Sequence, residues 1–177
     1  MAMTSVLYRS PLAEYPTAVQ SRGMYITDSS GKQYLDMSGG AAVSCVGHGH
    51  PHVLAAVKEQ LSNMAFAHTA FFTNQPQEKL AGRLSARFGD PTARVYFLSG
   101  GSEANETALK MAWQYWAARG MPDKKIIISR EHSYHGNTLG MLSISGNPAR
   151  RRASAAPLLD WPRISPCYAF RDREQSE

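Results

Sequence analysis

The sequence predicts a protein of the α/β class. Two segments are short, apolar and rich in β-branched or aromatic residues, as buried strands are: residues 94–98 and residues 125–129. Between them, Ala104, Ala108 and Met111 recur at helical spacing. A strand, a helix and a second strand within roughly 30 residues are typical of a βαβ unit, in which the two strands lie parallel.

Glycines connect the first predicted strand to the helix. Gly100 and Gly101 free the backbone for a sharp bend, and Ser102 is a favourable N-cap residue. The first N–H groups of a helix have no partner inside it, and the macrodipole makes that end positive. The turn therefore predicts a phosphate site. The alternative is an ordinary strand–helix turn, and Glu103 and Glu106 in the first turns would compete with an anion.

The loop after the second predicted strand, residues 131–136, offers Tyr134 and His135. Loops that follow parallel strands meet at one edge of the sheet, where open α/β sheets bind ligands. We therefore expect this loop to lie beside the glycine turn. A ligand with a phosphate at one end and an aromatic ring at the other would fit both, although Tyr134 also suits an exposed loop without a ligand.

The remaining segments predict a smaller set of elements. Residues 1–20 suit an irregular arm, and residues 24–35 suit a β-hairpin whose turn ends in Gly31. Apolar residues at helical spacing predict two amphipathic helices, residues 51–64 and about residues 75–88. From residue 150 onward the chain reads as loop.

Composition narrows the class of protein. The chain has 177 residues, of which 43% are hydrophobic, so one globular domain with a core is expected. The formal net charge of +5 is modest, and no nucleic-acid motif accompanies it. No apolar run approaches the roughly 20 residues that span a bilayer. Cys45 and Cys167 lie far apart, which favours a reducing compartment, and a soluble cytoplasmic protein is expected.

Three histidines in five residues, His48, His50 and His52, raise the alternative of a metal-binding protein. The spacing argues against that alternative. Pro51 is expected to open a helix, which places His52 in its first turn, while alternation sends the other side chains in different directions. We therefore expect no metal site there.

Five sequence blocks together resemble one family. They are Tyr34-Leu-Asp36, Gly47-His-Gly-His-Pro51, Phe71-Phe-Thr-Asn74, Ser99-Gly-Gly-Ser-Glu-Ala-Asn-Glu106 and Ser133-Tyr-His-Gly136. Over about residues 10–170 the chain resembles the amino-terminal part of a class III (ω-amino-acid type) aminotransferase that depends on pyridoxal phosphate (PLP). The resemblance implies an incomplete three-layer αβα large domain of the aspartate-aminotransferase type, over residues 51–177. An amino-terminal arm and β-hairpin, residues 1–50, would belong to a small domain.

The resemblance also implies roles for single residues. Gly101 and Ser102 would hold the cofactor phosphate, Tyr134 would stack on the pyridine ring, and His135 would lie beside it. The family is dimeric with shared active sites, so a homodimer is implied.

The same resemblance implies a substrate pocket. Phe71 and Phe72 would line it, in the neighbouring subunit, although core or interface packing is the alternative for this pair. The small-residue stretch 39–43 would flank the substrate. Some amine-accepting relatives carry a bulky aromatic residue near the position of Ala42, whose small side chain leaves more room.

Family members are more than twice as long, and the lysine that forms the imine with PLP lies in the part that has no counterpart here. None of this chain's lysines suits that role: Lys32, Lys58, Lys79, Lys110, Lys124 and Lys125. The family reaction would move an amino group from an amine or ω-amino acid to a keto acid such as pyruvate. The isolated chain is expected to be inactive. The alternative is a non-catalytic fragment or pseudo-enzyme that keeps phosphate affinity or an interaction surface.

Overall fold

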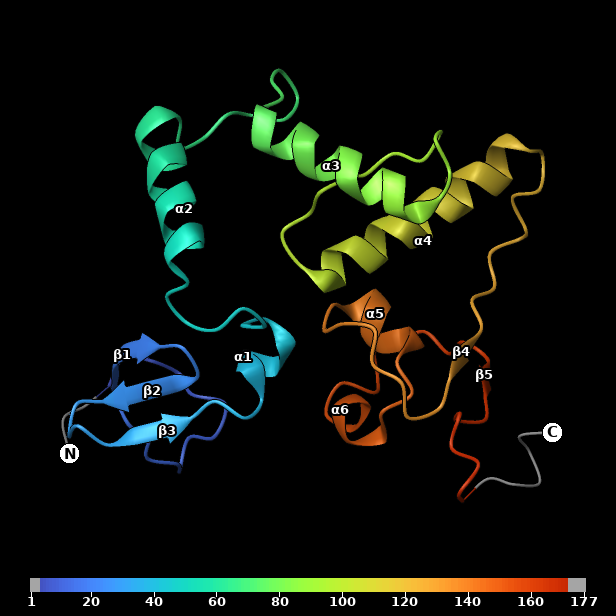
Figure 1. Ribbon diagram of the computed structural model, residues 1–177. Helices are drawn as coiled ribbons and strands as arrows, with labels where there is room; N and C mark the ends of the chain where they lie inside the picture. The colour runs from blue at the N-terminus through green and yellow to red at the C-terminus, as the bar shows by residue number, and fades with distance from the viewer. Residues whose placement is uncertain (1–3, 172–177) are drawn as a thin grey trace. The chain divides into compact units, whose positions relative to one another are not determined.

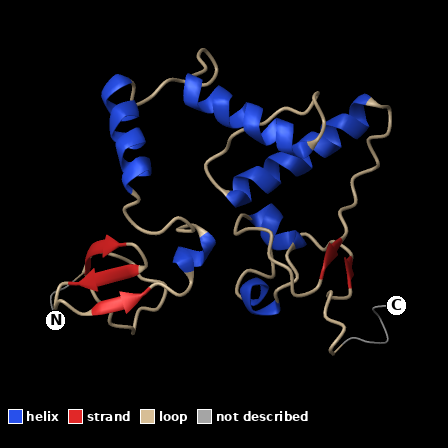
Figure 2. Cartoon of the chain, in the orientation of Figure 1, coloured by secondary structure: helices blue, strands red, loops and turns tan. Residues whose placement is uncertain are grey.

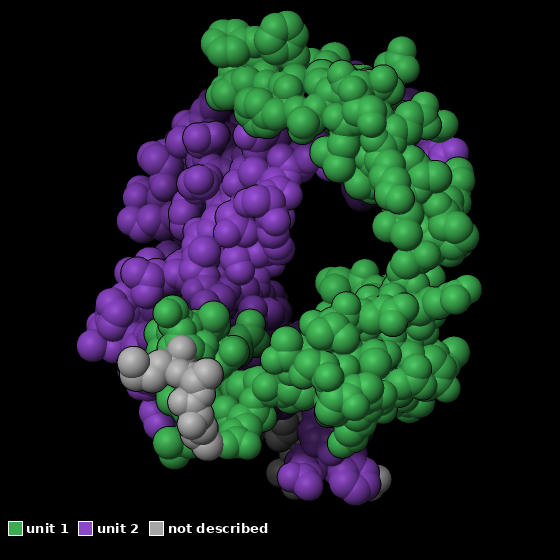
Figure 3. All heavy atoms as spheres, turned by 90° about the vertical axis from the view of Figure 1, so that its left-hand side faces the viewer, with its two compact units in different colours: residues 1–79 green, residues 80–177 purple. Residues whose placement is uncertain are grey.

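A computed structural model describes residues 4–171, which divide into two compact units. Unit 1 ends at Lys79 and unit 2 begins at Leu80 (Figure 3). Both units combine helices with strands, so the predicted α/β class is confirmed (Figure 2). No helix within residues 4–171 is long and apolar enough to cross a membrane.

Unit 1 contains a three-stranded antiparallel sheet in the order β1 (Ala18–Arg22), β2 (Tyr25–Asp28) and β3 (Gln33–Leu35) (Figure 1). The β2–β3 hairpin confirms the prediction. Strand β1 was missed, because it falls at the end of the predicted arm. All its residues are exposed, so its sequence lacks the alternation of apolar and polar residues that marks a half-buried strand.

Asp28 holds the hairpin turn together. Its carboxylate accepts hydrogen bonds from the backbone N–H of Ser30 at 2.9 Å and of Lys32 at 3.0 Å, and from the Tyr34 hydroxyl at 2.8 Å. Gly31 provides the left-handed φ of +85° that the turn requires. The side-chain hydrogen bonds from Ser30 and Tyr34 lower the pKa of Asp28 from its ordinary value of 3.8 to about 2.

The lowered pKa predicts a pH dependence of the hairpin. A group whose pKa is lower in the folded state stabilises that state above its unfolded pKa and loses this effect as the pH falls. We expect protection of the Lys32 amide against hydrogen exchange to be constant above about pH 4 and to decline towards pH 2. In Asp28→Asn this decline should flatten. Asp123→Asn, in unit 2, should leave it unchanged, and an identical decline in Asp28→Asn would contradict the assignment.

Three helical segments follow the sheet. Helix α1 (Gly39–Ala42) is a turn of left-handed backbone, with φ between +56° and +68°. Helices α2 (Pro51–Asn63) and α3 (Gln75–Phe88), which continues into unit 2, lie where the hydrophobic periodicity predicts them. The Asn74 side chain accepts a hydrogen bond from the Gln77 N–H at 2.9 Å, which fixes the start of α3.

The strands of unit 2 differ from the prediction. Residues 94–98 form no strand, and the second strand, β4, is only Ser129–Arg130. It pairs in parallel with β5 (Arg163–Ile164), which lies in the segment predicted to be loop. An extended segment becomes a strand only when a neighbouring strand binds its N–H and C=O groups. The βαβ prediction was therefore wrong about which segments pair.

The helices of unit 2 are α4 (Gly101–Ala118), α5 (Leu139–Ile144) and α6 (Pro148–Arg152). Helix α5 lies against α4 (Figure 1) and carries the buried apolar side chains among the described residues, Met141, Leu142 and Ile144. The core of unit 2 is therefore small and lies at the carboxyl side of residues 131–138.

Candidate functional site

Helix α4 begins two residues before its predicted start. Gly100, which has no side chain, is the N-cap residue, so the predicted capping role of Ser102 is wrong. Ser102 lies inside the first turn, and its Oγ accepts a hydrogen bond from the Asn137 N–H at 2.9 Å. A hydroxyl oxygen that accepts one hydrogen bond still has its own O–H to donate. Ser102 therefore keeps a donor beside the free N–H groups of the helix start.

Residues 133–138 dock on the first two turns of α4. Besides the Ser102 contact, the Asn105 side-chain amide donates to the His135 carbonyl at 2.7 Å, and the Thr138 hydroxyl donates to Glu106 at 2.5 Å. The predicted neighbourhood of glycine turn and Tyr134 loop is therefore confirmed. Asn105 and Thr138 were missed, because their polar side chains carry no signal of a long-range partner.

Close backbone approach makes this docking possible. Gly136 has a φ of +146°, and a Cβ atom there would lie 2.7 Å from Ser102 Oγ and 2.9 Å from Ser102 Cα. A Cβ at Gly140 would lie 2.5 Å from the Glu106 carboxylate. Gly136 therefore requires glycine, whereas at Gly140 the Glu106 side chain would have to move.

The two acids of the first turns behave differently. Glu106 accepts the hydrogen bond of the Thr138 hydroxyl, so its carboxylate is engaged within the chain. The carboxylate of Glu103 lies 2.6 Å from the position of a Cβ on Gly100, so it stays at the helix start. By contrast, a Cβ at Gly101 would meet nothing within 4 Å. Space for a ligand is therefore found at Gly101, next to a carboxylate that lowers the affinity for an anion.

Tyr134 and His135 face different surroundings. The Tyr134 side chain is exposed, and the Arg150 guanidinium lies 4.6 Å from its ring centroid. The Nε2 atom of His135 is buried and has no hydrogen-bond partner within residues 4–171. It borders a pocket of about 300 Å³ shared with Ser129 and Ile164. A buried polar atom without a partner is costly, so a ligand or water with a polar group is expected there.

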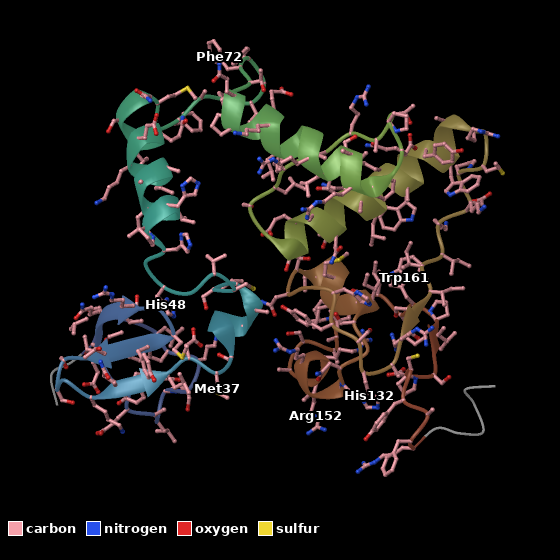
Figure 4. The ribbon with its side chains drawn as sticks, viewed as in Figure 1. Met37, His48, Phe72, His132, Arg152 and Trp161 are labelled. Carbon is pink, nitrogen blue, oxygen red and sulfur yellow. The ribbon has the colours of Figure 1, made fainter. Side chains whose placement is uncertain are left out.

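The other predicted site residues lie in unit 1. Phe71 and Phe72 are in the loop between α2 and α3, where Figure 4 labels Phe72. They are 79% and 66% exposed, so they do not belong to a core within residues 4–171. Ala42 lies in the left-handed turn α1, with a φ of +68°. L-residues rarely adopt this conformation, so α1 is strained at Ala42 and at its neighbour Ala41.

His48 binds Asp36 rather than the neighbouring histidines. Its Nε2 lies 2.9 Å from Asp36 Oδ2, and the same carboxylate accepts from the Gly40 N–H at 3.0 Å and from the Ser44 hydroxyl at 3.1 Å. Led by the Gly40 N–H, these hydrogen bonds lower the pKa of Asp36 to about 2. Residues 4–171 contain no group of three His, Cys, Asp or Glu side chains placed to hold a metal ion.

Comparison with known proteins identifies the family. The family described as aminotransferase class-III matches residues 11–173. The chain belongs to the class III aminotransferases. An uncharacterized aminotransferase of Schizosaccharomyces pombe, C1771.03c, is 38% identical over 97% of this chain and 38% of its own length. The uncharacterized aminotransferase YodT of Bacillus subtilis is 39% identical over 99% of the chain and 40% of its own length.

Solved transaminases have the same fold. A PLP-bound amine transaminase from an uncultivated Pseudomonas species matches with a TM-score of 0.89 and 31% identity, over 99% of this chain and 42% of that one. An (S)-enantioselective omega-transaminase from Thermomicrobium roseum matches with a TM-score of 0.84 and 32% identity, over 95% and 39%. The class III chain thus has part of the fold of PLP-dependent transaminases, and PLP is the cofactor that the family indicates. It spans about two fifths of the length of these relatives.

Proposed function

We propose that this class III chain supplies the phosphate- and ring-binding part of a PLP-dependent aminotransferase site. The reaction would transfer an amino group from an amine or ω-amino acid to a keto acid such as pyruvate. Relatives whose names specify a substrate support an ω-amino acid, among them a gamma-aminobutyrate transaminase of Solanum lycopersicum that is 41% identical over 76% of this chain.

One observation carries the proposal: residues 133–138 are bound directly to the first turns of α4. The Asn137 N–H on Ser102 Oγ and the Asn105 amide on the His135 carbonyl fix this arrangement. Tyr134 is therefore held close to the helix start, where unpartnered N–H groups favour a phosphate. A phosphate and a ring joined by a short linker, as in PLP, match two such features on one rigid support.

The residues present fit the cofactor in three respects. Gly101 leaves open space, Ser102 has a hydroxyl proton to donate, and His135 has a buried Nε2 without a partner. When bound, PLP withdraws electrons from the carbon that carries the amino group. Ser102 and the helix N–H groups would anchor the phosphate, and Tyr134 would orient the ring and exclude water from one face. Arg150 lies over one face of the Tyr134 ring. For the cofactor ring to stack on Tyr134, Arg150 must move away or the cofactor must use the other face.

The proposal assigns no covalent lysine to this chain. Lys110 lies eight residues beyond Ser102, roughly 12 Å along the axis of α4. The Lys124 ammonium lies 3.3 Å from the Trp116 ring centroid, and both Lys124 and Lys125 precede β4, whereas the Tyr134 loop follows it. We infer that the chain alone binds PLP without transaminating. A pseudo-enzyme that only retains cofactor affinity would share this behaviour.

We also propose that the chain forms a homodimer and resides in a reducing compartment. The exposed side chains of Phe71 and Phe72 support a second subunit, because large apolar side chains in a loop gain stability when a partner covers them. A homodimer is therefore part of the proposal. Cys45 and Cys167 are both free and exposed, which supports a reducing compartment such as the cytoplasm.

Ser102→Ala tests the proposed phosphate site. Loss of a hydrogen bond to a charged group should weaken PLP binding by about tenfold or more, measured by calorimetric titration of the full chain. Ser62→Ala is the matched control, because Ser62 is a serine of another helix, α2, where its hydroxyl donates to the Lys58 carbonyl. Equal PLP affinities in the two variants would exclude Ser102 from the site.

A further inference from the structure

A second cavity lies where the parallel strands β4 and β5 end. It has a volume of about 720 Å³ and is lined by residues 130–133, which follow β4, and by residues 166–168 and Arg171, which follow β5. His132, which lies in the loop after β4 (Figure 4), lines this cavity. The carboxyl ends of parallel strands are the edge at which open α/β sheets bind ligands. None of the residues assigned above to the cofactor lines this cavity, which we call the arginine cavity.

The charge of the arginine cavity is positive. Arg130 and Arg171 line the cavity, and neither side chain has a hydrogen bond or ion pair within residues 4–171. Glu131 is the acid among the lining residues. The Arg163 Nε lies 2.9 Å from its carboxylate and offsets part of its charge, while the same guanidinium lies 3.5 Å from Asp160. Two arginines without such partners line the same cavity, and their positive charge attracts an anion. The planar arrays of N–H donors on a guanidinium group suit the oxygens of carboxylate or phosphate.

The wall of the cavity is fixed by backbone contacts. The His132 N–H donates to the Gly146 carbonyl at 3.0 Å, and the Ser133 hydroxyl donates to the Arg130 carbonyl at 2.6 Å. A Cβ on Gly146 would lie 2.2 Å from the Arg130 carbonyl oxygen, so the two segments are in close contact. His132 itself has a left-handed φ of +59°. Strained residues held by their surroundings concentrate at binding sites, because the strain fixes the shape that the ligand meets.

We propose that the arginine cavity binds a small oxyanion, a carboxylate or a phosphate, between Arg130 and Arg171. Exposed Tyr168 would cover the apolar part of such a ligand. This assignment goes beyond the cofactor site at α4, because it uses other residues and needs no PLP.

Titration of the full chain with sodium pyruvate and, separately, with inorganic phosphate tests the proposal at low ionic strength. Amide resonances of His132, Ser133 and Tyr168 should shift in heteronuclear NMR spectra. Arg130→Gln and Arg171→Gln should each weaken binding by about tenfold. Arg87→Gln removes the same charge from the last turn of α3 and should leave the affinity unchanged.

The variants also separate this cavity from the phosphate site at α4. If Ser102→Ala abolishes the binding of both anions and the two arginine variants do not, the anions bind at α4 and the proposal is wrong. Unshifted resonances at His132 and Tyr168 with either anion would also overturn it. Binding of pyruvate alone identifies a carboxylate site, and binding of both anions identifies a general oxyanion site. Because Arg171 lies at an exposed end of the described chain, Arg171→Gln keeps the test valid if Arg130→Gln fails to fold.

Discussion

Gly136→Ala should detach the Tyr134 loop from helix α4. The added Cβ would lie 2.7 Å from Ser102 Oγ and 2.9 Å from Met141 Cβ, in backbone with a φ of +146°. Overpacking costs about 1–3 kcal/mol, and a strained backbone conformation costs a further 1–3 kcal/mol, roughly. The Asn137 N–H should lose its bond to Ser102, seen as faster hydrogen exchange of that amide. PLP affinity should fall with it, because the ring and phosphate sites would no longer be held together.

Gly82→Ala is the matched control for this substitution. Gly82 lies within α3, and a Cβ there would meet nothing within 4 Å. Replacing a helical glycine by alanine stabilises the helix by about 0.5–1 kcal/mol. If Gly136→Ala and Gly82→Ala leave both the Asn137 amide and the PLP affinity unchanged, the close approach at Gly136 has no functional consequence.

Arg151→Ala should destabilise α5, the helix that carries the buried apolar side chains. The Arg151 Nη1 group lies 2.9, 2.6 and 3.1 Å from the carbonyl oxygens of Leu142, Ser143 and Ser145. One NH₂ group carries two hydrogens, so these contacts amount to about two charged hydrogen bonds, and their loss should cost roughly 2–4 kcal/mol. Exchange of the Leu142 and Ser145 amides, which bond within this helix, measures the effect.

The neighbouring Arg152 provides the control. It is exposed, and its side chain has no hydrogen bond or ion pair within residues 4–171, so Arg152→Ala should change stability by no more than about 0.5 kcal/mol. Arg151→Lys should recover only part of the loss, because an ammonium group cannot reproduce the planar fork. Equal amide exchange in Arg151→Ala and Arg152→Ala would show that the carbonyl contacts do not stabilise α5.

The elements that the sequence predicted well are those determined by neighbouring residues. The β2–β3 hairpin depends on Asp28 and Gly31 within one turn, and the boundaries of α2 and α3 depend on Pro51 and Asn74. The strands of unit 2 were predicted less well. Residues 94–98 have strand composition but pair with no strand within residues 4–171, whereas the sequence of β5 carries no strand signal and β5 pairs with β4. Pairing depends on segments far apart in the chain, which composition does not reveal.

The site was predicted correctly in its outline but for a different physical reason. Parallel pairing of residues 94–98 with residues 125–129 was expected to bring the Tyr134 loop to α4. That pairing is absent from residues 4–171, and direct contacts from Asn105 and Gly136 join the two segments instead. The sequence also gave no indication that Arg150 would lie over the Tyr134 ring, because a run of three arginines suits a solvated surface equally well.

A PLP titration of the full chain, followed by heteronuclear NMR, tests most directly whether this chain holds the cofactor. The amide resonances of Gly101, Ser102, Tyr134 and His135 should shift together and saturate with one affinity. Borohydride reduction of the saturated sample should leave no single lysine labelled stoichiometrically. Shifts confined to other residues, or a stoichiometric label on one lysine, would contradict the claim that this chain holds the cofactor's phosphate and ring without a covalent lysine.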